Sequence, residues 1–438
     1  MNTIKQMQDD ISLAGTDGYR PRILDRAAGE RLRDSGAVFI EGIGHCGKTS
    51  SARKLSGSVL LLRDPSGNFR NRMLAEMEPA LALRGAATRL IDEWQEAPAV
   101  LDAAAAAASV QGTGRQFIFT CSSLPREKEE PHGVLDRMPH LRLRTMTLSE
   151  TGDSDGSVSL SSLFDGTFRP HMTGGISLSR LAGLIVRGGW PESLGVSGEK
   201  AAVLPQQYLR DILGRAEAGP DGIRRDRGKI LALLRALARN ESRCVSDRGL
   251  RRDILNHDRV SVSNPTVLSY LDVLRRLFLT DDQPAFSNYV RTSVRQKKMA
   301  KRHLADPSLA CALLGLDAAG LIDDLCTMGF MFEALCEHDL RVYAESSGGR
   351  LFHYQDYQEK SIDAVVEMND GRWGAFDIRL GANEIDDAAG TLISLRKSIA
   401  RDAHGRVPEF LCVICGLSEA AYVRPDGVFV IPITSLRP

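Results

Sequence analysis

The sequence GIGHCGKTS, at residues 42–50, decides the fold of this chain, because it matches the pattern G-x-x-x-x-G-K-[ST] at every fixed position. An apolar run, AVFI at residues 37–40, precedes it, and a run that favours a helix follows at residues 50–55. A strand, a glycine-rich loop and a helix in this order form the loop that holds nucleotide phosphates. The alternative is a chance match in a glycine-containing turn. The flanking runs favour a phosphate-binding loop.

Residues of this loop have distinct expected roles. Gly42 and Gly47 allow the backbone to turn tightly, so that successive N–H groups converge on a phosphate. We expect the ammonium of Lys48 to bind the β- and γ-phosphates of ATP and the hydroxyl of Thr49 to ligate Mg²⁺. The other loop residues expected to contact the nucleotide are Gly44, His45, Cys46 and Ser50.

A second motif, LIDE at residues 90–93, ends the third apolar run of the chain. Open α/β sheets bind their ligands at the carboxyl ends of the strands. Asp92 is therefore expected near the Mg²⁺, and Glu93 is expected to polarise the attacking water as a general base. The alternative is a surface pair of acids at a strand end. Together the two motifs predict ATP hydrolysis rather than binding alone.

The spacing of apolar runs predicts a doubly wound parallel α/β domain of the P-loop NTPase type. Beyond the P-loop, strands are expected at residues 59–62, 90–93, 116–123 and 141–148, and an alanine-rich helix at residues 97–110.

Two further residue types in this domain are candidates for catalysis. At the end of the fourth strand, the hydroxyl of Thr120 or Ser122 is positioned to sense the γ-phosphate, or else it caps a turn. Residues 124–139 are expected to form a loop in which Arg137 acts as a finger on the nucleotide of a neighbouring subunit. The alternative for Arg137 is a solvated surface arginine.

A family resemblance follows from motifs spread along the chain. In order these motifs are YRPR (19–22), GIGHCGKT (42–49), LIDEWQEAP (90–98), FIFTCSS (117–123), HGVLDR (132–137), LSE (148–150), RGGWPE (187–192), KRHLADPSLA (301–310), FEALCEHDLRVY (332–343) and the segment 363–381. The set resembles the AAA-type ATP-binding proteins of bacteria and archaea that carry a C-terminal domain of unknown function. This resemblance implies an ATP-driven module of the AAA+ type. The sequence departs from the family where Thr120-Cys121-Ser122 replaces the usual Thr-Gly-Ser, and within residues 132–137.

Composition and termini are consistent with a soluble globular protein. The 438 residues are 43% hydrophobic and 26% charged, and no apolar run reaches the length of a membrane span. The first twenty residues are polar, so we expect neither a secretory signal nor a transit peptide, and a cytoplasmic location. The eight cysteines are expected to be reduced, including Cys412 and Cys415, whose CxxC spacing lies in an apolar run.

Charge is distributed unevenly, although the formal net charge is zero. Residues 224–302 contain 19 Lys and Arg against 8 Asp and Glu, whereas residues 303–438 contain 11 against 21. In the basic segment, helices are expected from residue 229, after Ser246 and after Asn264, followed by a hairpin up to about residue 294. This order is typical of a winged helix, whose third helix enters the major groove of DNA. Duplex DNA and a protein partner both remain open as ligands of this segment.

The acidic C-terminal segment predicts an α/β restriction-endonuclease-like fold. A helix is expected at residues 325–336, with strands near 341–343, 351–354, 361–368 and 373–380. Glu333, Asp363, Asp377 and Arg379 then resemble the acids and the basic residue of a nuclease site. Arg379 stands where such a site has lysine, and a guanidinium does not deprotonate. We therefore expect a degenerate site that has lost cleavage.

The resulting hypothesis divides the chain into an ATPase domain with a helical lid (1–200), a winged-helix-like segment (201–300) and an acidic nuclease-like domain (301–438). The leading function is an Mg²⁺-dependent ATPase whose nucleotide state controls the other two parts, on DNA in one version of the hypothesis. Two alternatives stay open: a nucleotide-gated protein-interaction module with little turnover, and an ATP-regulated nuclease. Self-association at the nucleotide site is a further expectation.

Overall fold

The computed structural model of the chain describes residues 18–109, 116–124, 138–196, 198–219, 221–287, 299–355, 361–401 and 405–438. The chain divides into two compact units. Unit 1 comprises the described residues up to Arg144 together with two short returns, residues 221–222 and Arg276–Phe278. Unit 2 comprises Thr145–Gly219, Ile223–Arg275 and Leu279–Pro438.

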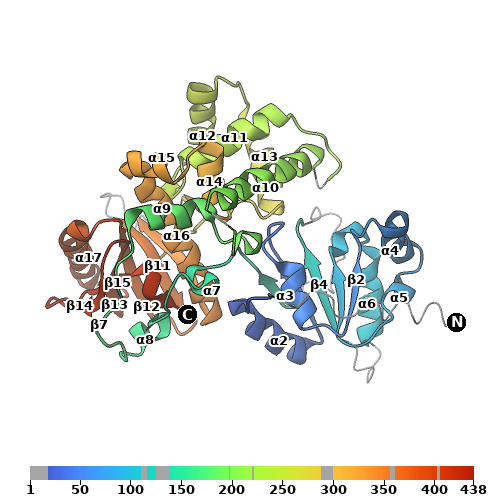
Figure 1. Cartoon of the computed structure of the whole chain (residues 1–438), viewed down its shortest axis with the longest axis horizontal. Coiled ribbons are helices and arrows are strands. Elements are labelled where there is room, and N and C mark those ends of the chain that lie inside the picture. Colours follow the sequence, from blue (N-terminus) through green and yellow to red (C-terminus); the bar gives the residue numbers. More distant parts are fainter. Residues whose placement is uncertain are drawn as a thin grey trace. The chain divides into compact units, whose positions relative to one another are not determined.

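Unit 1 is built on a parallel sheet of five strands in the order β2-β3-β4-β1-β5. The strands are β1 (Ala37–Glu41), β2 (Ser58–Leu61), β3 (Arg89–Asp92), β4 (Phe117–Cys121) and β5 (His140–Arg142). Strands β1 and β4 are almost entirely buried, as their continuous apolar sequences require in a sheet covered on both faces. Figure 1 shows the sheet with helices packed around it. The prediction of a parallel sheet in an α/β domain is therefore confirmed, and it is consistent with a P-loop NTPase fold.

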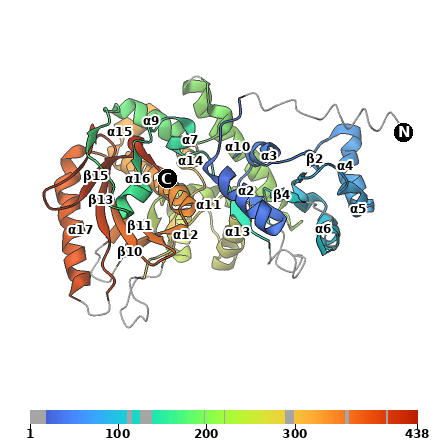
Figure 2. The same ribbon diagram turned by 90° about the horizontal axis from the view of Figure 1, so that it is seen from below.

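The helices of unit 1 precede the first strand or lie between the strands in the chain. They are α2 (Ile23–Ser35), α3 (Lys48–Lys54), α4 (Ser66–Met77), α5 (Pro79–Ala82), the 3₁₀ turn η1 (Trp94–Glu96) and α6 (Ala99–Ser109). In Figure 2 the short helix α5 lies beside α4, which it contacts. The prediction of a fifth strand over residues 141–148 was wrong in its extent. Strand β5 ends at Arg142, and Thr147 caps the next helix by accepting from the backbone N–H of Glu150.

Unit 2 begins with short elements and two longer helices. These are α7 (Leu148–Thr151), β6 (Val158–Ser159), α8 (Leu160–Phe164), β7 (His171–Met172), α9 (Leu178–Arg187), η3 (Pro191–Ser193) and α10 (Gly198–Ala218). The division between units at Arg144 differs from the predicted boundary near residue 200. Residues 145–196 are tied to later parts of unit 2: Leu148 N–H donates to Asp339 Oδ2 at 2.9 Å, and Gly189 N–H to Asp306 Oδ2 at 3.0 Å.

The basic segment folds as helices joined by very short strands. Its elements are α11 (Arg227–Arg239), β8 (Arg243–Cys244), α12 (Asp247–Asp253), the π-helical turn η4 (Ile254–Asp258), α13 (Asn264–Arg276) and β9 (Lys301–Arg302). Strand β8 pairs antiparallel with β9, and Gln283 and Thr280 bridge antiparallel to Lys301 and Leu304. The helix boundaries agree with the prediction, except that Ser263 rather than Asn264 caps α13: the Ser263 hydroxyl accepts from Thr266 N–H at 3.2 Å.

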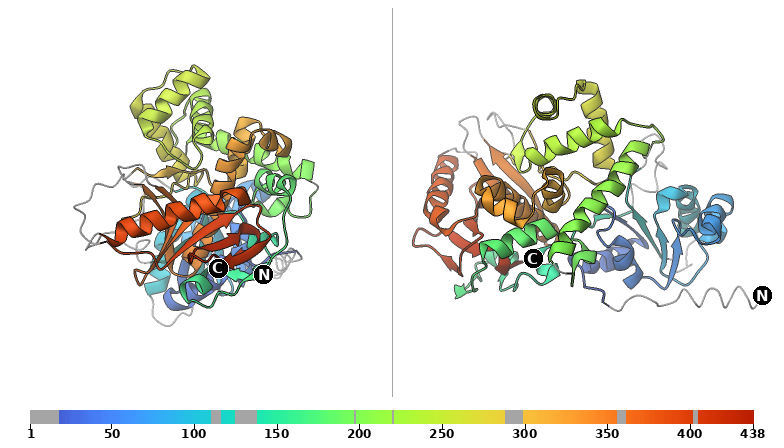
Figure 3. Two further views of the ribbon diagram at one scale, coloured as in Figure 1. Left: turned by 90° about the vertical axis from the view of Figure 1, so that its left-hand side faces the viewer. Right: turned by 45° about the horizontal axis from the view of Figure 1, so that its top comes forward.

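The rest of unit 2 contains a seven-stranded mixed sheet in the order β10-β11-β12-β13-β15-β14-β7. Its later strands are β10 (Gly349–Gln355), β11 (Ser361–Met368), β12 (Trp373–Arg379), β13 (Phe410–Cys415), β14 (Ala420–Val423) and β15 (Phe429–Pro432), and β16 (Leu436–Arg437) pairs with β6 instead. The helices are α14 (Pro307–Leu314), α15 (Ala318–Asp323), α16 (Leu325–Ser346) and α17 (Ile385–Ala400), with 3₁₀ turns η5 (Ala382–Glu384) and η6 (Ile433–Ser435). Figure 3 shows α17 lying across the strands of the sheet.

The predicted strand at residues 341–343 does not exist, because α16 continues through it to Ser346. Leu340, Tyr343 and Ala344 are buried and extend the helical spacing of the buried Phe332 and Cys336. The short run around Val342 therefore belongs to a helix that is apolar on a wide face. The other three strands predicted in this segment are present.

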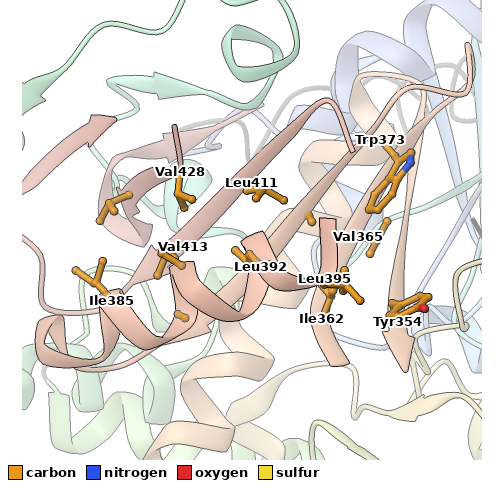
Figure 4. Packing of buried hydrophobic residues seen from close by; sticks show 14 of the residues in the cluster. Tyr354, Ile362, Val365, Trp373, Ile385, Leu392, Leu395, Leu411, Val413 and Val428 are labelled. Carbon is orange, nitrogen blue, oxygen red and sulfur yellow. The ribbon is translucent and has the colours of Figure 1, made fainter. Parts of the chain in front are cut away.

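The main core of this sheet lies between α17 and the strands. Leu392 and Leu395 of α17 pack with Val365, Leu411 and Val413, all at most 3% exposed. Figure 4 shows these side chains between the helix and the sheet. All eight cysteines are free, and Cys412 and Cys415 are buried in β13, as predicted.

Candidate nucleotide site and a buried charge cluster

The P-loop connects the carboxyl end of β1 to the first turn of α3. A Cβ at Gly42 would lie 2.1 Å from the carbonyl oxygen of Leu143, so only glycine fits there. Gly47 has φ 97°, a conformation that glycine adopts without strain. Glycine at both fixed positions of the motif is therefore explained by the local structure, by lack of space at Gly42 and by the backbone conformation at Gly47.

Side chains of the loop are held by the protein itself. Lys48 is 4% exposed, and its Nζ donates to the carbonyl oxygen of Ile43 at 2.8 Å. The thiol of Cys46 donates to the carbonyl of Leu143 at 3.3 Å, so only the backbone of Cys46 remains for a phosphate. Gly44 and His45 complete the loop, and Ser50 lies in α3.

Arg22, just before α2, holds the P-loop through hydrogen bonds to backbone carbonyl groups. Its guanidinium donates to the carbonyl oxygens of Cys46 and Arg144, both at 2.8 Å. Tyr19 donates to Asp25 at 2.6 Å and lies 3.0 Å from the hydroxyl of Ser51 in α3. The YRPR motif was visible in the sequence, but only the fold shows that it braces the P-loop.

Asp92 lies at the carboxyl end of β3, and β4 lies between β3 and β1, the strand that leads into the P-loop. Its Oδ1 accepts hydrogen bonds from Thr49 at 2.8 Å and from Thr120 at 2.7 Å. Burial raises the pKa of this carboxyl, an effect that the two hydroxyls partly offset. Thr49 and Asp92 are therefore in direct contact, as a shared Mg²⁺ site requires, and a carboxylate and a hydroxyl are oxygen ligands of the kind that Mg²⁺ prefers.

Glu93 follows Asp92 in a left-handed backbone conformation, with φ 59°. A non-glycine residue in this conformation is strained, and such strain is common at functional sites. Its Oε2 accepts from the hydroxyl of Ser122 and from the amide of Gln95, both at 2.5 Å. Burial opposes ionisation, but the charges of Lys48 and Arg63 and the hydrogen bonds from Ser122 and Gln95 together outweigh it, so the pKa of Glu93 is lowered. The carboxylate is thus ionised, as a general base must be.

Arg63 is a site residue that sequence reasoning missed. It follows β2, and its Nη1 lies 3.0 Å from Glu93 Oε2 and 3.1 Å from the hydroxyl of Ser122. Its other nitrogens pair with Glu96. The sequence could have indicated this role, because Arg63 directly follows the second apolar run. The carboxyl ends of parallel strands meet at one edge of a sheet, so a residue after that strand is expected near the acids that follow β3.

The predicted sensor residues lie next to the acids. Thr120 contacts Asp92 and also accepts from the backbone N–H of Glu93 at 3.0 Å, while Ser122 contacts Glu93. Their proposed sensing of the γ-phosphate stays a prediction. Arg137 lies outside the described residues, and its role as a finger stays a prediction as well.

The predicted nuclease-like residues are distributed over α16, β11 and β12. Glu333 pairs with Lys301 at 2.6 Å, and Asp363 accepts from the backbone N–H of Ile378 at 2.8 Å. Asp377 is 2% exposed and lies 2.8 Å from Nε of Arg379. Among the described residues, no three His, Cys, Asp or Glu side chains are grouped so that they could hold a metal ion.

Lys301 is the centre of a buried charge cluster in unit 2. Its Nζ lies 2.6 Å from Glu333, 2.7 Å from Glu337 and 3.1 Å from the carbonyl oxygen of Asp363. From the sequence, Lys301 belongs to the basic segment at residues 224–302, which is expected to bind DNA or a protein. The structure corrects this for Lys301, because its ammonium is buried and paired with Glu333 and Glu337. Burial opposes its ionisation, but these acids outweigh burial and raise its pKa.

His303 extends the same cluster. Its ring nitrogens lie 2.9 Å from Glu241 and 3.1 Å from Glu337. Burial opposes protonation, but the charges of Glu337 and Glu241 overcome it and raise the pKa of His303 to about 9. Lys301 and His303 together hold the pKa of Glu337 below its ordinary value, against the effect of burial. Arg302, also in the predicted basic run, pairs with Asp247 and Asp282 at 2.6 Å each.

Comparisons with known proteins match two segments of the chain. Residues 178–320 match the family model "Domain of unknown function (DUF8612)", and residues 328–436 match "Domain of unknown function (DUF4143)". No curated protein matches the chain. A solved structure, the Walker-type ATPase PABY2304 of Pyrococcus abyssi, is similar over 66% of this chain and 95% of its own, with 12% identity and a TM-score of 0.39.

A membrane-crossing helix would need a long and sufficiently apolar stretch, and no helix in the described ranges of the chain has one.

Proposed function

We propose that the chain is an Mg²⁺-dependent ATPase. The observation that carries this proposal is the contact between Thr49 of the P-loop and Asp92 of β3, with the ionised Glu93 as the next residue. A P-loop by itself supports only binding. An acid beside the proposed metal ligands supplies the base that hydrolysis needs.

Each residue has a defined task in this proposal. The P-loop N–H groups and Lys48 bind the phosphates, and Thr49 and Asp92 hold Mg²⁺, which when bound offsets the negative charge of the phosphates. Glu93 accepts a proton from the attacking water. Ser122 and Gln95 orient the carboxylate of Glu93, since both donate to the same oxygen.

A second candidate is a nucleotide-gated interaction protein that turns over little ATP. One observation favours it: the oxygen Oε2 of Glu93 accepts three hydrogen bonds, from the amide of Gln95 and from the hydroxyl and backbone N–H of Ser122, and it pairs with Arg63. A carboxylate held in this way is a weaker base and is less free to reach a water. The two candidates differ in the rate of hydrolysis and share the same binding site.

The remaining parts of the function are proposals that rest on the sequence and on the order of elements. The helix-strand-helix-helix order of residues 227–276, followed by paired extended segments, supports a winged-helix segment. Contact with duplex DNA through residues 224–302, a nuclease-like C-terminal fold, a cytoplasmic location and self-association at the nucleotide site are proposed on the same basis. An active nuclease is not proposed, because Glu333, Asp363 and Asp377 are each paired within the protein.

Two substitutions test the ATPase proposal. Lys48→Ala should abolish ATP binding, measured by titration of a fluorescent ATP analogue with Mg²⁺. Glu93→Gln should retain binding and lower the rate of phosphate release by roughly a hundredfold or more. Glu30→Gln is the matched control, because Glu30 is exposed and pairs with Arg26 within α2. Normal hydrolysis by Glu93→Gln would contradict the proposal, and negligible hydrolysis by the unmodified protein would favour the second candidate.

A further inference from the structure

A stripe of arginines, defined as Arg248, Arg251, Arg252 and Arg259, begins in α12 and ends at the residue after the π-helical turn η4. Arg248, Arg251, Arg252 and Arg259 are exposed, while Leu250 and Ile254 on the other side of the same segment are fully buried. Spacings of three and four residues place Arg248, Arg251 and Arg252 on one face of α12, whereas Arg259 follows η4 in a left-handed backbone conformation. Leu255, 53% exposed, lies within the stripe.

Acids of the same segment do not neutralise this stripe, because they pair elsewhere. Asp247 pairs with Arg302 of β9 at 2.6 Å. Asp253 and Asp258 both pair with Arg239 of α11 at 2.5 Å. Within the described part of the chain, no ion pair involves any of the four stripe arginines. Their charge is therefore uncompensated and is presented to solvent.

The helix that a winged-helix comparison would favour, α13, has a different surface. Its exposed face carries Leu268 and Ser269, and its one exposed arginine, Arg275, pairs with Asp272 at 2.7 Å. Arg276 at its end is buried and donates to the carbonyl of Leu124. Helix α13 thus offers little net positive charge to a polyanion.

We propose that α12 and η4, rather than α13, form the surface that binds the phosphate backbone of duplex DNA. This inference rests on the proposed DNA contact of residues 224–302. Three guanidiniums on one face of α12, with that of Arg259 close by in the chain, suit the repeating charge of a duplex backbone, and guanidinium groups bind phosphate oxygens in a bidentate manner. Backbone contacts carry no base specificity, so binding should depend on salt and hardly on sequence.

The test compares two triple charge reversals by fluorescence anisotropy with a short labelled duplex of arbitrary sequence. The test variant is Arg248→Glu, Arg251→Glu, Arg252→Glu. The matched control reverses Arg350, Lys397 and Arg401, which are exposed and form no ion pair within the described ranges. We expect the test variant to lose roughly tenfold or more in affinity at low salt and to lower the slope of log K against log salt by about 2 to 3. The control should lose far less.

Each other outcome is decisive. Equal binding by the test variant and the unmodified protein would overturn the assignment to α12 and η4. Equal losses in both variants would also overturn it, because overall charge would then explain the effect. An absence of DNA binding by the unmodified protein at low salt would remove the DNA contact altogether and favour a protein partner. ATP hydrolysis, measured in parallel without DNA, reports separately on the ATPase proposal, and thermal melting confirms that the variants fold.

Discussion

At the scale of single residues, the ion pair between Glu93 and Arg63 affects how well Glu93 can act as the base in the proposed hydrolysis of ATP. The guanidinium lowers the pKa of Glu93 and so weakens it as a base. Arg63→Ala should therefore move the acidic limb of the pH profile for hydrolysis to higher pH by roughly one unit, because a neighbouring positive charge is lost. The rate at neutral pH should rise, since the carboxylate becomes both more basic and freer to move.

The matched control for this prediction is Arg72→Ala, because Arg72 pairs with Glu76 and Glu96. Steady-state hydrolysis measured across pH distinguishes the two variants. An unchanged acidic limb in Arg63→Ala, or an equal shift in Arg72→Ala, would show that the pair with Arg63 does not set the basicity of Glu93.

At the scale of elements, α17 is held on its sheet by packing rather than by charge. Leu392 is 1% exposed in the core shared with β11, β12 and β13. Leu392→Ala should lower the free energy of unfolding by about 2 to 5 kcal/mol, because it removes apolar contacts and leaves a cavity. Alanine favours helix at least as well as leucine, so helix propensity does not contribute to the loss. Urea denaturation measures the difference.

The control for that variant lies on the exposed side of the same helix. Ser394 is exposed, and Ser394→Ala should change the free energy of unfolding by no more than about 0.5 kcal/mol. Similar unfolding midpoints for the two variants would contradict the view that the buried face of α17 stabilises this sheet.

At the scale of the whole molecule, the cluster around Lys301 and His303 joins parts of unit 2 that are distant in sequence. Glu241 precedes β8, Lys301 and His303 lie at β9, and Glu337 lies in α16. Because folding raises the pKa of His303 from 6.5 to about 9, its contribution to stability is fully present below about pH 6.5. That contribution is lost as the pH rises through about 9.

We therefore expect the free energy of unfolding to fall between pH 6.5 and 9, by on the order of 2 kcal/mol for this group. His303→Gln should flatten the curve over that interval, measured by urea denaturation at several pH values. The acid Glu333, whose pKa burial raises, adds a slope of the same sign, so the difference between the two proteins isolates His303. Titration of the His303 ring near pH 6.5, observed by NMR, would contradict the prediction.

The sequence by itself determined most of unit 1, the part of the chain that we propose binds ATP. The P-loop and the acids after β3 are local in the chain, and their spacing follows from the steric needs of one turn and the geometry of parallel strands. The apolar runs placed β1 to β4 to within two residues at either end. The same reasoning failed at residues 341–343, where a short apolar run fits a strand and a buried helix equally well.

Only the tertiary structure decided which charged side chains are exposed to solvent and which are paired with acids or carbonyl groups inside the protein. Lys301 and Arg302 look like part of a basic surface in the sequence, yet both pair with acids that are distant in the chain. Arg63 and Arg22 became site residues for the same reason, since ion pairs and carbonyl contacts form between segments that the fold brings together. Sequence spacing determines the local turns, helices and strands that residues close in the chain can form. The partner of a buried charge is set by packing, because an unpaired charge is too costly to bury.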